Sequence, residues 1–154
     1  MTVEIIADGI HLPPPLLQLV YKIKGPDKTA LITDAMRAAG GPEGHSILGS
    51  LEEGIPVIVE NGIAFLPDRT SFAGSVATAD RLVRSMVQLA GVDLPNAVKM
   101  ITQTPAAILG IDGAKGAIAI GKDADIVLFD DDIRVSTTII GGEIVFERPW
   151  PLKS

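Results

Sequence analysis

The first 34 residues alternate between strand-like and helix-like sequence, and this order constrains the fold more than any other feature. An apolar segment at 3–7 is followed by a proline-led stretch at 13–24, whose leucines and valines recur on one helical face. A second apolar segment spans 30–33. A strand, a helix and a strand at this spacing form a βαβ unit with parallel strands. The sequence therefore predicts an α/β fold.

Polar residues follow both predicted strands. Asp8, Gly9, Ile10 and His11 come after the first, and Asp34 comes after the second. Because α/β proteins bind ligands at the carboxyl ends of parallel strands, we expect these side chains to converge on one mouth. A carboxylate and an imidazole there can serve as base, acid or hydrogen-bond partner. From the residues alone, a turn role for Asp8, a core or capping role for His11 and a loop role for Asp34 remain open.

The rest of the chain predicts a hairpin, three helices and a β-rich C-terminal part. Asn61-Gly62 is typical of a type I′ turn, and His45 is expected to be exposed in a Gly/Pro-rich loop. The predicted elements are strands at 56–60 and 63–66, a helix from near Ser75 to Gly91, a helix capped by Asp93 that runs to 101, a helix capped by Thr104 that ends at Gly110, and strands at 116–120, 124–129, 136–140 and 143–146. A domain boundary is predicted near residue 112.

Charge and residue counts exclude several classes of function. Thirteen Lys and Arg against nineteen Asp and Glu give a net charge of −6, which argues against nucleic acid or an anionic membrane as partner. We recognise no membrane span and no signal peptide, so a cytoplasmic location is expected. With no cysteine and only two separated histidines, the chain has no metal-binding motif of its own.

Short motifs are spread along nearly the whole chain. They are IADGIH at 6–11, ITDAM and AAG within 32–40, FAGS at 72–75, TPA at 104–106 with Leu109-Gly110, GAIAIGKDAD at 116–125, and Ile140-Gly141-Gly142. In this order they resemble the N-acetylglucosamine-6-phosphate deacetylase family of the amidohydrolase superfamily. Phe72 stands where that family has leucine.

The resemblance implies a fold of which this chain is one part. Family members form a (β/α)₈ TIM-type barrel with a small β-sandwich lobe. Residues 1–112 would supply the last two β/α units of the barrel, and 113–154 would supply strands of the small lobe. Because such a barrel needs at least roughly 200 residues, the 154 residues are expected to be the C-terminal part of an enzyme.

The resemblance also implies a reaction and a set of site residues. The reaction is deacetylation of N-acetylglucosamine 6-phosphate, with a divalent metal such as zinc that polarises the acetyl carbonyl and activates water. Asp34 matches the catalytic aspartate, while Asp8, Gly9, Ile10, His11, Phe72, Ala73 and Gly74 match substrate-contacting stretches. The metal ligands would lie on earlier strands, outside this chain, and the complete enzyme would be a homodimer.

Two alternatives remain open at this point. The first is a cyclic amidohydrolase of the dihydroorotase or hydantoinase type, since the GKDAD segment is shared across amidohydrolases; IADGIH and FAGS favour the amino-sugar branch. The second is a non-catalytic fragment or interaction module, which the absence of metal ligands from the chain favours for the isolated polypeptide.

Overall fold

The N-terminal part of the molecule is one βαβ unit. The computed structural model describes residues 1–149, and in it β1 (Val3–Ile5) pairs in parallel with β2 (Thr29–Leu31). Between them, α1 (Pro14–Lys24) begins after Pro13 and ends at Gly25, whose φ of 69° a glycine adopts without steric cost. The parallel pairing and the α/β class are confirmed, although both strands are shorter than predicted.

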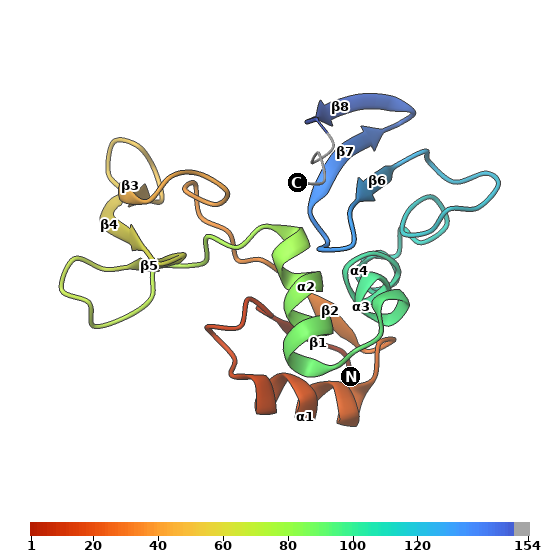
Figure 1. Cartoon of the computed structure of the whole chain (residues 1–154), viewed down its shortest axis with the longest axis horizontal. Coiled ribbons are helices and arrows are strands. Elements are labelled where there is room, and N and C mark those ends of the chain that lie inside the picture. The colour runs from red at the N-terminus through yellow and green to blue at the C-terminus, as the bar shows by residue number, and fades with distance from the viewer. Residues whose placement is uncertain (150–154) are drawn as a thin grey trace.

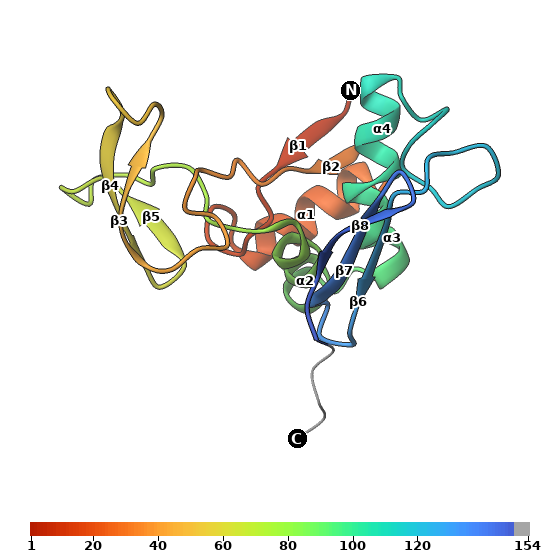
Figure 2. The same ribbon diagram turned by 90° about the horizontal axis from the view of Figure 1, so that it is seen from above.

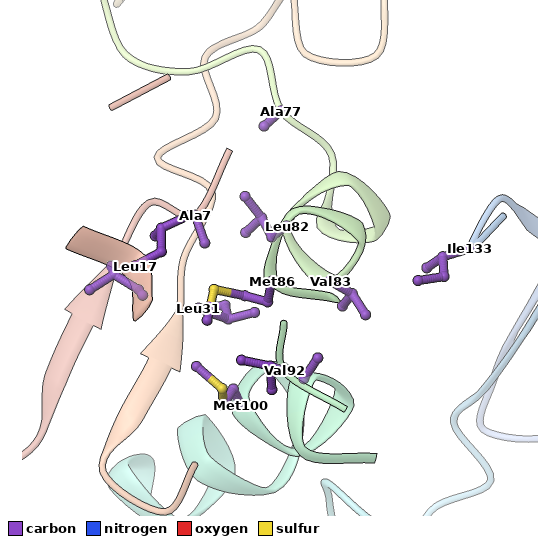
Figure 3. Close-up of a cluster of buried hydrophobic side chains, with 12 residues drawn as sticks. Ala7, Leu17, Leu31, Ala77, Leu82, Val83, Met86, Val92, Met100 and Ile133 are labelled. Carbon is purple, nitrogen blue, oxygen red and sulfur yellow. The ribbon is translucent and has the colours of Figure 1, made fainter. Parts of the chain in front are cut away.

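The main hydrophobic core lies between this unit and two further helices, α2 (Ala79–Ala90) and α3 (Leu94–Ile101). α4 (Gln103–Leu109) follows α3 in the chain. Figure 3 shows Leu17, Leu31, Leu82, Met86 and Met100 converging from α1, β2, α2 and α3, and all five are almost completely buried. Burying each such side chain contributes roughly 1.5–3 kcal/mol, so this cluster holds β1 and β2 in place.

Two helix starts differ from the prediction. α2 begins at Ala79 rather than near Ser75, because the backbone of Ser75 is bonded to the Asp34 carbonyl and its hydroxyl accepts from the Ala77 N–H. α4 is preceded by Thr102 and not capped by Thr104. The Thr104 hydroxyl is buried and donates instead to the Pro26 carbonyl, at 2.7 Å.

A second, antiparallel sheet projects from one side of the core (Figures 1 and 2). It has the order β3 (Gly44–Leu48), β4 (Ile55–Glu60) and β5 (Ile63–Phe65). Positive φ at both Asn61 and Gly62 confirms the type I′ turn. His45 lies in β3, where it pairs with Ile58 of β4, so the prediction that it lies in a loop is wrong. His45 is exposed, as expected.

The C-terminal part is a third sheet, which lies on the other side of α2 from the β3–β5 sheet (Figures 1 and 2). It is antiparallel, as expected, with the order β6 (Ile126–Phe129), β7 (Val135–Ile140) and β8 (Glu143–Glu147). Ile133, in the turn between β6 and β7, enters the main core, and Arg84 of α2 donates to its carbonyl. These contacts fix the sheet against α2.

The strand predicted at 116–120 is wrong. This segment is irregular and contains no strand, and Ile118 and Ile120 are exposed. Gly116 has a φ of +87° and lies so close to the Gln103 backbone that a Cβ would approach it to 3.0 Å, so the chain turns there instead of extending. The boundary near residue 112 stays a prediction. Within residues 1–149, no helix has the length and apolar character needed to cross a membrane.

Candidate active site

The loop after β1 is organised by the carboxylate of Asp8. Its Oδ1 accepts from the backbone N–H groups of Ile10 and His11, both at 2.9 Å, and its Oδ2 lies 2.9 Å from His11 Nδ1. Short aspartate side chains favour such turns because they satisfy backbone donors two and three residues ahead. Asp8 therefore both shapes the loop and holds the imidazole.

The ionised form of Asp8 is favoured in the folded protein. Burial alone raises the pKa of this carboxyl, but the hydrogen bonds from His11 and Ile10 and the attraction of the His11 ring together outweigh it. The net result is a pKa below the ordinary value of 3.8. Near neutral pH, His11 thus faces a carboxylate that can only accept.

The FAGS segment lies against the same loop. The rings of His11 and Phe72 meet edge to face with centroids 5.1 Å apart, and Phe72 also contacts Phe65 of β5 at 5.7 Å. Aromatic pairs at these separations add about 0.5–1.5 kcal/mol beyond burial. Residues far apart in the sequence, from IADGIH and FAGS, thus form one wall.

Asp34 joins this wall from the segment after β2. Ser75 N–H donates to the Asp34 carbonyl at 2.9 Å and Met36 N–H donates to the Ser75 carbonyl at 2.8 Å, so Ala35 and Ser75 form a parallel bridge. Gly74, with φ +69°, lies so close that a Cβ would sit 3.2 Å from the Asp34 carbonyl oxygen and 3.9 Å from its Oδ2. A glycine is therefore needed beside this carboxylate.

The backbone of Asp34 has an uncommon conformation. Its φ is +47°, in the left-handed region that aspartate enters more readily than most residues. Asp34 is exposed to solvent, whereas Asp8 is buried. The two carboxylates of the site therefore have different environments: one is committed to the loop and the other faces solvent.

The structure brings the sequence-predicted residues together, but not all in the same way. Phe72 is 45% exposed, Ala73 is buried with only its backbone near the site, and Gly9, Ile10, His11 and Gly74 are half-buried. Among the contacts within residues 1–149, none joins Asp34 directly to His11; the Phe72–Gly74 segment links them. Phe65 was missed by the sequence analysis, although phenylalanine is scarce in the chain and recurs seven residues later.

The chain does not provide a metal-binding site in its described part. No group of three or more His, Cys, Asp or Glu residues within 1–149 is arranged to hold a metal ion. His11 is bonded to Asp8, and His45 is exposed on β3. Zinc sites need three or four protein ligands, so these residues do not fit one.

Comparison with known proteins gives consistent matches over almost the whole chain. The model of the amidohydrolase family matches residues 2–145. N-acetylglucosamine-6-phosphate deacetylase of Bacillus subtilis is 37% identical over 143 residues, which are 93% of this chain and 35% of that protein. The human enzyme of the same name is 34% identical over 92% of this chain and 34% of its own length.

A shorter relative also matches. A putative N-acetylgalactosamine-6-phosphate deacetylase of Escherichia coli is 37% identical over 144 residues, 92% of this chain and 81% of that protein. By contrast, the chain spans about a third of the length of the other relatives described above.

Solved structures agree with these sequence matches. N-acetylglucosamine-6-phosphate deacetylase from Pasteurella multocida superposes with a TM-score of 0.86 and 31% identity, over 96% of this chain and 37% of that one. The enzyme of the same name from Thermotoga maritima gives a TM-score of 0.82 and 35% identity, over 96% and 39%. The fold described here is therefore similar to a part of these larger proteins.

Proposed function

Because the chain belongs to the amidohydrolase family, we propose that it forms one wall of an enzyme active site that removes acetate from N-acetylglucosamine 6-phosphate. In this proposal residues 1–112 are the last two β/α units of a (β/α)₈ barrel, and the later strands belong to its small lobe. The names of the relatives support the substrate. The observation that carries the proposal is the meeting of the IADGIH, ITDAM and FAGS segments at one place.

Asp34 is proposed as the proton-transfer group. Hydrolysis of an acetamide adds water to the carbonyl carbon and then breaks the C–N bond, so one proton must leave the water and one must reach the departing nitrogen. A single carboxylate beside both atoms can do each task in turn. The exposed Asp34 side chain suits such a position, because its backbone carbonyl accepts from the Ser75 N–H and the Ser75 carbonyl in turn accepts from the Met36 N–H.

The neighbouring wall is proposed to hold the sugar. His11 would hydrogen-bond a sugar hydroxyl, and the half-exposed ring of Phe72 would pack on the apolar face of the pyranose. Gly74 has no side chain, so the backbone here can approach a ligand closely. Ala73 would contribute only main-chain atoms, since its side chain packs into the second cluster with Met36 and Val59.

Further parts of the proposal depend on polypeptide outside the described residues. A divalent metal, such as zinc, would be held by ligands from elsewhere, since no group of three or more His, Cys, Asp or Glu in the described part of the chain is arranged to hold one. The homodimer that the family resemblance implies and the cytoplasmic location both stay predictions.

A chimera tests the role of Asp34. We would replace the matched segment of the Bacillus subtilis relative with this chain and measure acetate release from N-acetylglucosamine 6-phosphate. Replacing Asp34 by Asn should lower kcat by about 10²–10⁴-fold, the usual contribution of a general acid–base group. Asp68→Asn removes the same charge from an exposed loop where Asn can still accept from the Thr70 N–H, so it should leave turnover unchanged.

The outcomes separate the candidate functions. Near-normal kcat in Asp34→Asn would remove Asp34 from this role, and ring opening of dihydroorotate or hydantoin without acetate release would favour a cyclic amidohydrolase. The isolated 154-residue chain, assayed with added Zn²⁺, is expected to show no deacetylation. Robust turnover by that chain alone would contradict the view that it supplies only part of the site.

A further inference from the structure

The carboxylate of Asp8 faces its own loop and not a ligand. Both oxygens are occupied, Oδ1 by the N–H groups of Ile10 and His11 and Oδ2 by His11 Nδ1. The side chain is only 3% exposed. A residue so enclosed does not fit the direct substrate contact that the family resemblance implies for this position.

This arrangement selects one protonation pattern of the imidazole. An ionised carboxylate only accepts hydrogen bonds, so the 2.9 Å contact places a proton on Nδ1 of His11. In the neutral ring the other nitrogen, Nε2, then carries a lone pair. No hydrogen bond from another group within residues 1–149 reaches Nε2, and the His11 side chain is 19% exposed.

The ring is also fixed in orientation. Besides the bond to Asp8, the ring has an edge-to-face contact with Phe72, which comes from a distant part of the sequence. The loop that carries it is seated on α2, since Gly9 has φ +81° and a Cβ there would approach Leu89 Cδ1 to 2.8 Å. Backbone, carboxylate and aromatic contacts therefore leave the imidazole little freedom to rotate.

We propose that Asp8 is a positioning residue that holds His11 in the Nδ1–H form and so presents Nε2 as a hydrogen-bond acceptor to a substrate hydroxyl. This inference rests on the proposed function for the identity of the ligand, a hydroxyl-bearing sugar phosphate. It assigns Asp8 an action through His11, and of these two residues only His11 touches the ligand.

The protonation pattern can be measured without any turnover. In ¹⁵N-labelled protein at about pH 9, well above the ordinary pKa of imidazole, two-bond ¹H–¹⁵N spectra distinguish a protonated from an unprotonated ring nitrogen. His11 should show Nδ1 protonated and Nε2 unprotonated. His45, exposed on β3, supplies the reference ring, and His45→Gln assigns the two sets of signals.

An isosteric variant tests the cause. In Asp8→Asn the amide oxygen can still accept from the Ile10 and His11 N–H groups, but the NH₂ group donates to Nδ1, so the ring should change to the Nε2–H form. Asp93→Asn is the matched control, because Asp93 caps α3 by accepting from the Asn96 N–H and asparagine caps equally well. It should leave the His11 signals unchanged.

The results separate this inference from the proposed function. An Nε2–H ring in the unaltered protein, or an unchanged ring in folded Asp8→Asn, would overturn the role of Asp8; the first measurement needs no variant to fold. In the active chimera, Asp8→Asn should raise KM at least tenfold, and Asp93→Asn should not. A chimera without acetate release would defeat the proposed function and leave the ring measurement standing.

Discussion

At the scale of single residues, the candidate site depends on two neighbours with left-handed backbone. Asp34 has φ +47° and Gly74 has φ +69°, and they are joined through the Ser75 N–H bond to the Asp34 carbonyl. Uncommon backbone conformations persist where the surrounding structure enforces them, and they cluster at functional sites. Asp34 thus presents its carboxylate to solvent, and Gly74 beside it has no side chain that could cover that carboxylate.

Replacing Gly74 by Ala should reveal this close approach. The left-handed conformation costs an alanine about 1 kcal/mol, and a Cβ only 3.2 Å from the Asp34 carbonyl oxygen adds strain. Gly91→Ala is the matched control, because Gly91 has the same φ of +69° with no atom within 4 Å. Urea denaturation should show a larger loss of unfolding free energy for Gly74→Ala; equal losses would mean that the contact with Asp34 is unimportant.

The pKa of Asp8 predicts a pH dependence of stability. Because folding lowers the pKa of this carboxyl below 3.8, the folded state holds the proton less tightly than the unfolded state. The stabilisation is therefore fully present well above pH 3.8, begins to fall near that pH, and is lost as the pH falls through the lower, folded-state pKa. The difference in urea midpoint between the unaltered protein and Asp8→Asn should shrink below about pH 4. A difference that stays constant from pH 7 to pH 3 would contradict this linkage.

At the scale of elements, the sequence predicted what local chemistry determines and missed what distant contacts determine. The βαβ unit, the Asn61-Gly62 turn and the Asp93 cap of α3 are confirmed, because proline, glycine and aspartate act through their own neighbours. β3 was missed, since its pairing with β4 offsets the weak local signal around His45. The predicted parallel strands allowed Asp8, His11 and Asp34 to be placed at the same edge of the sheet. The position of Phe72 beside them depends on its contact with Phe65 of β5, which local sequence does not indicate.

Thr104 is the clearest case of a distant contact, and it supports a prediction. Its buried hydroxyl donates to the Pro26 carbonyl and ties α4 to the segment before β2. Thr104→Val keeps the shape but removes the donor, so the unfolding free energy should fall by about 1–3 kcal/mol. Thr104→Ser retains the hydroxyl and should recover most of that loss in thermal or urea unfolding. Equal stability of all three proteins would show that the bond contributes nothing.

At the scale of the whole molecule, apolar surface is left uncovered around β1 and α1. A groove of about 480 Å³ runs along them, and its walls include Ile5, Leu16, Val20 and Ile32. Ile23, which also lines the groove, is 67% exposed. The edge of β1 that faces away from β2 is unpaired within residues 1–149. Exposed apolar strips and open strand edges favour association.

This surface predicts concentration-dependent self-association of the isolated chain. The double variant Leu19→Lys and Ile23→Lys places charges on the exposed face of α1, where the two side chains are 50% and 67% exposed. It should lower the sedimentation coefficient at high protein concentration while changing the unfolding free energy by no more than about 0.5 kcal/mol. Lys22→Ala, on the same helix, tests whether any surface change has this effect. An unaltered chain that sediments as a monomer at all concentrations would refute the prediction.

The bridge between Ala35 and Ser75 has an architectural consequence. It brings together the two ends of the excursion from 36 to 74, which contains the whole β3–β4–β5 sheet. Closure entropy rises by only about 0.6 kcal/mol for each doubling of a flexible loop. Because the bridge holds the first and last residues of the excursion together, its length and its secondary structure can vary among other proteins of this architecture. The residues beside the bridge would keep their positions.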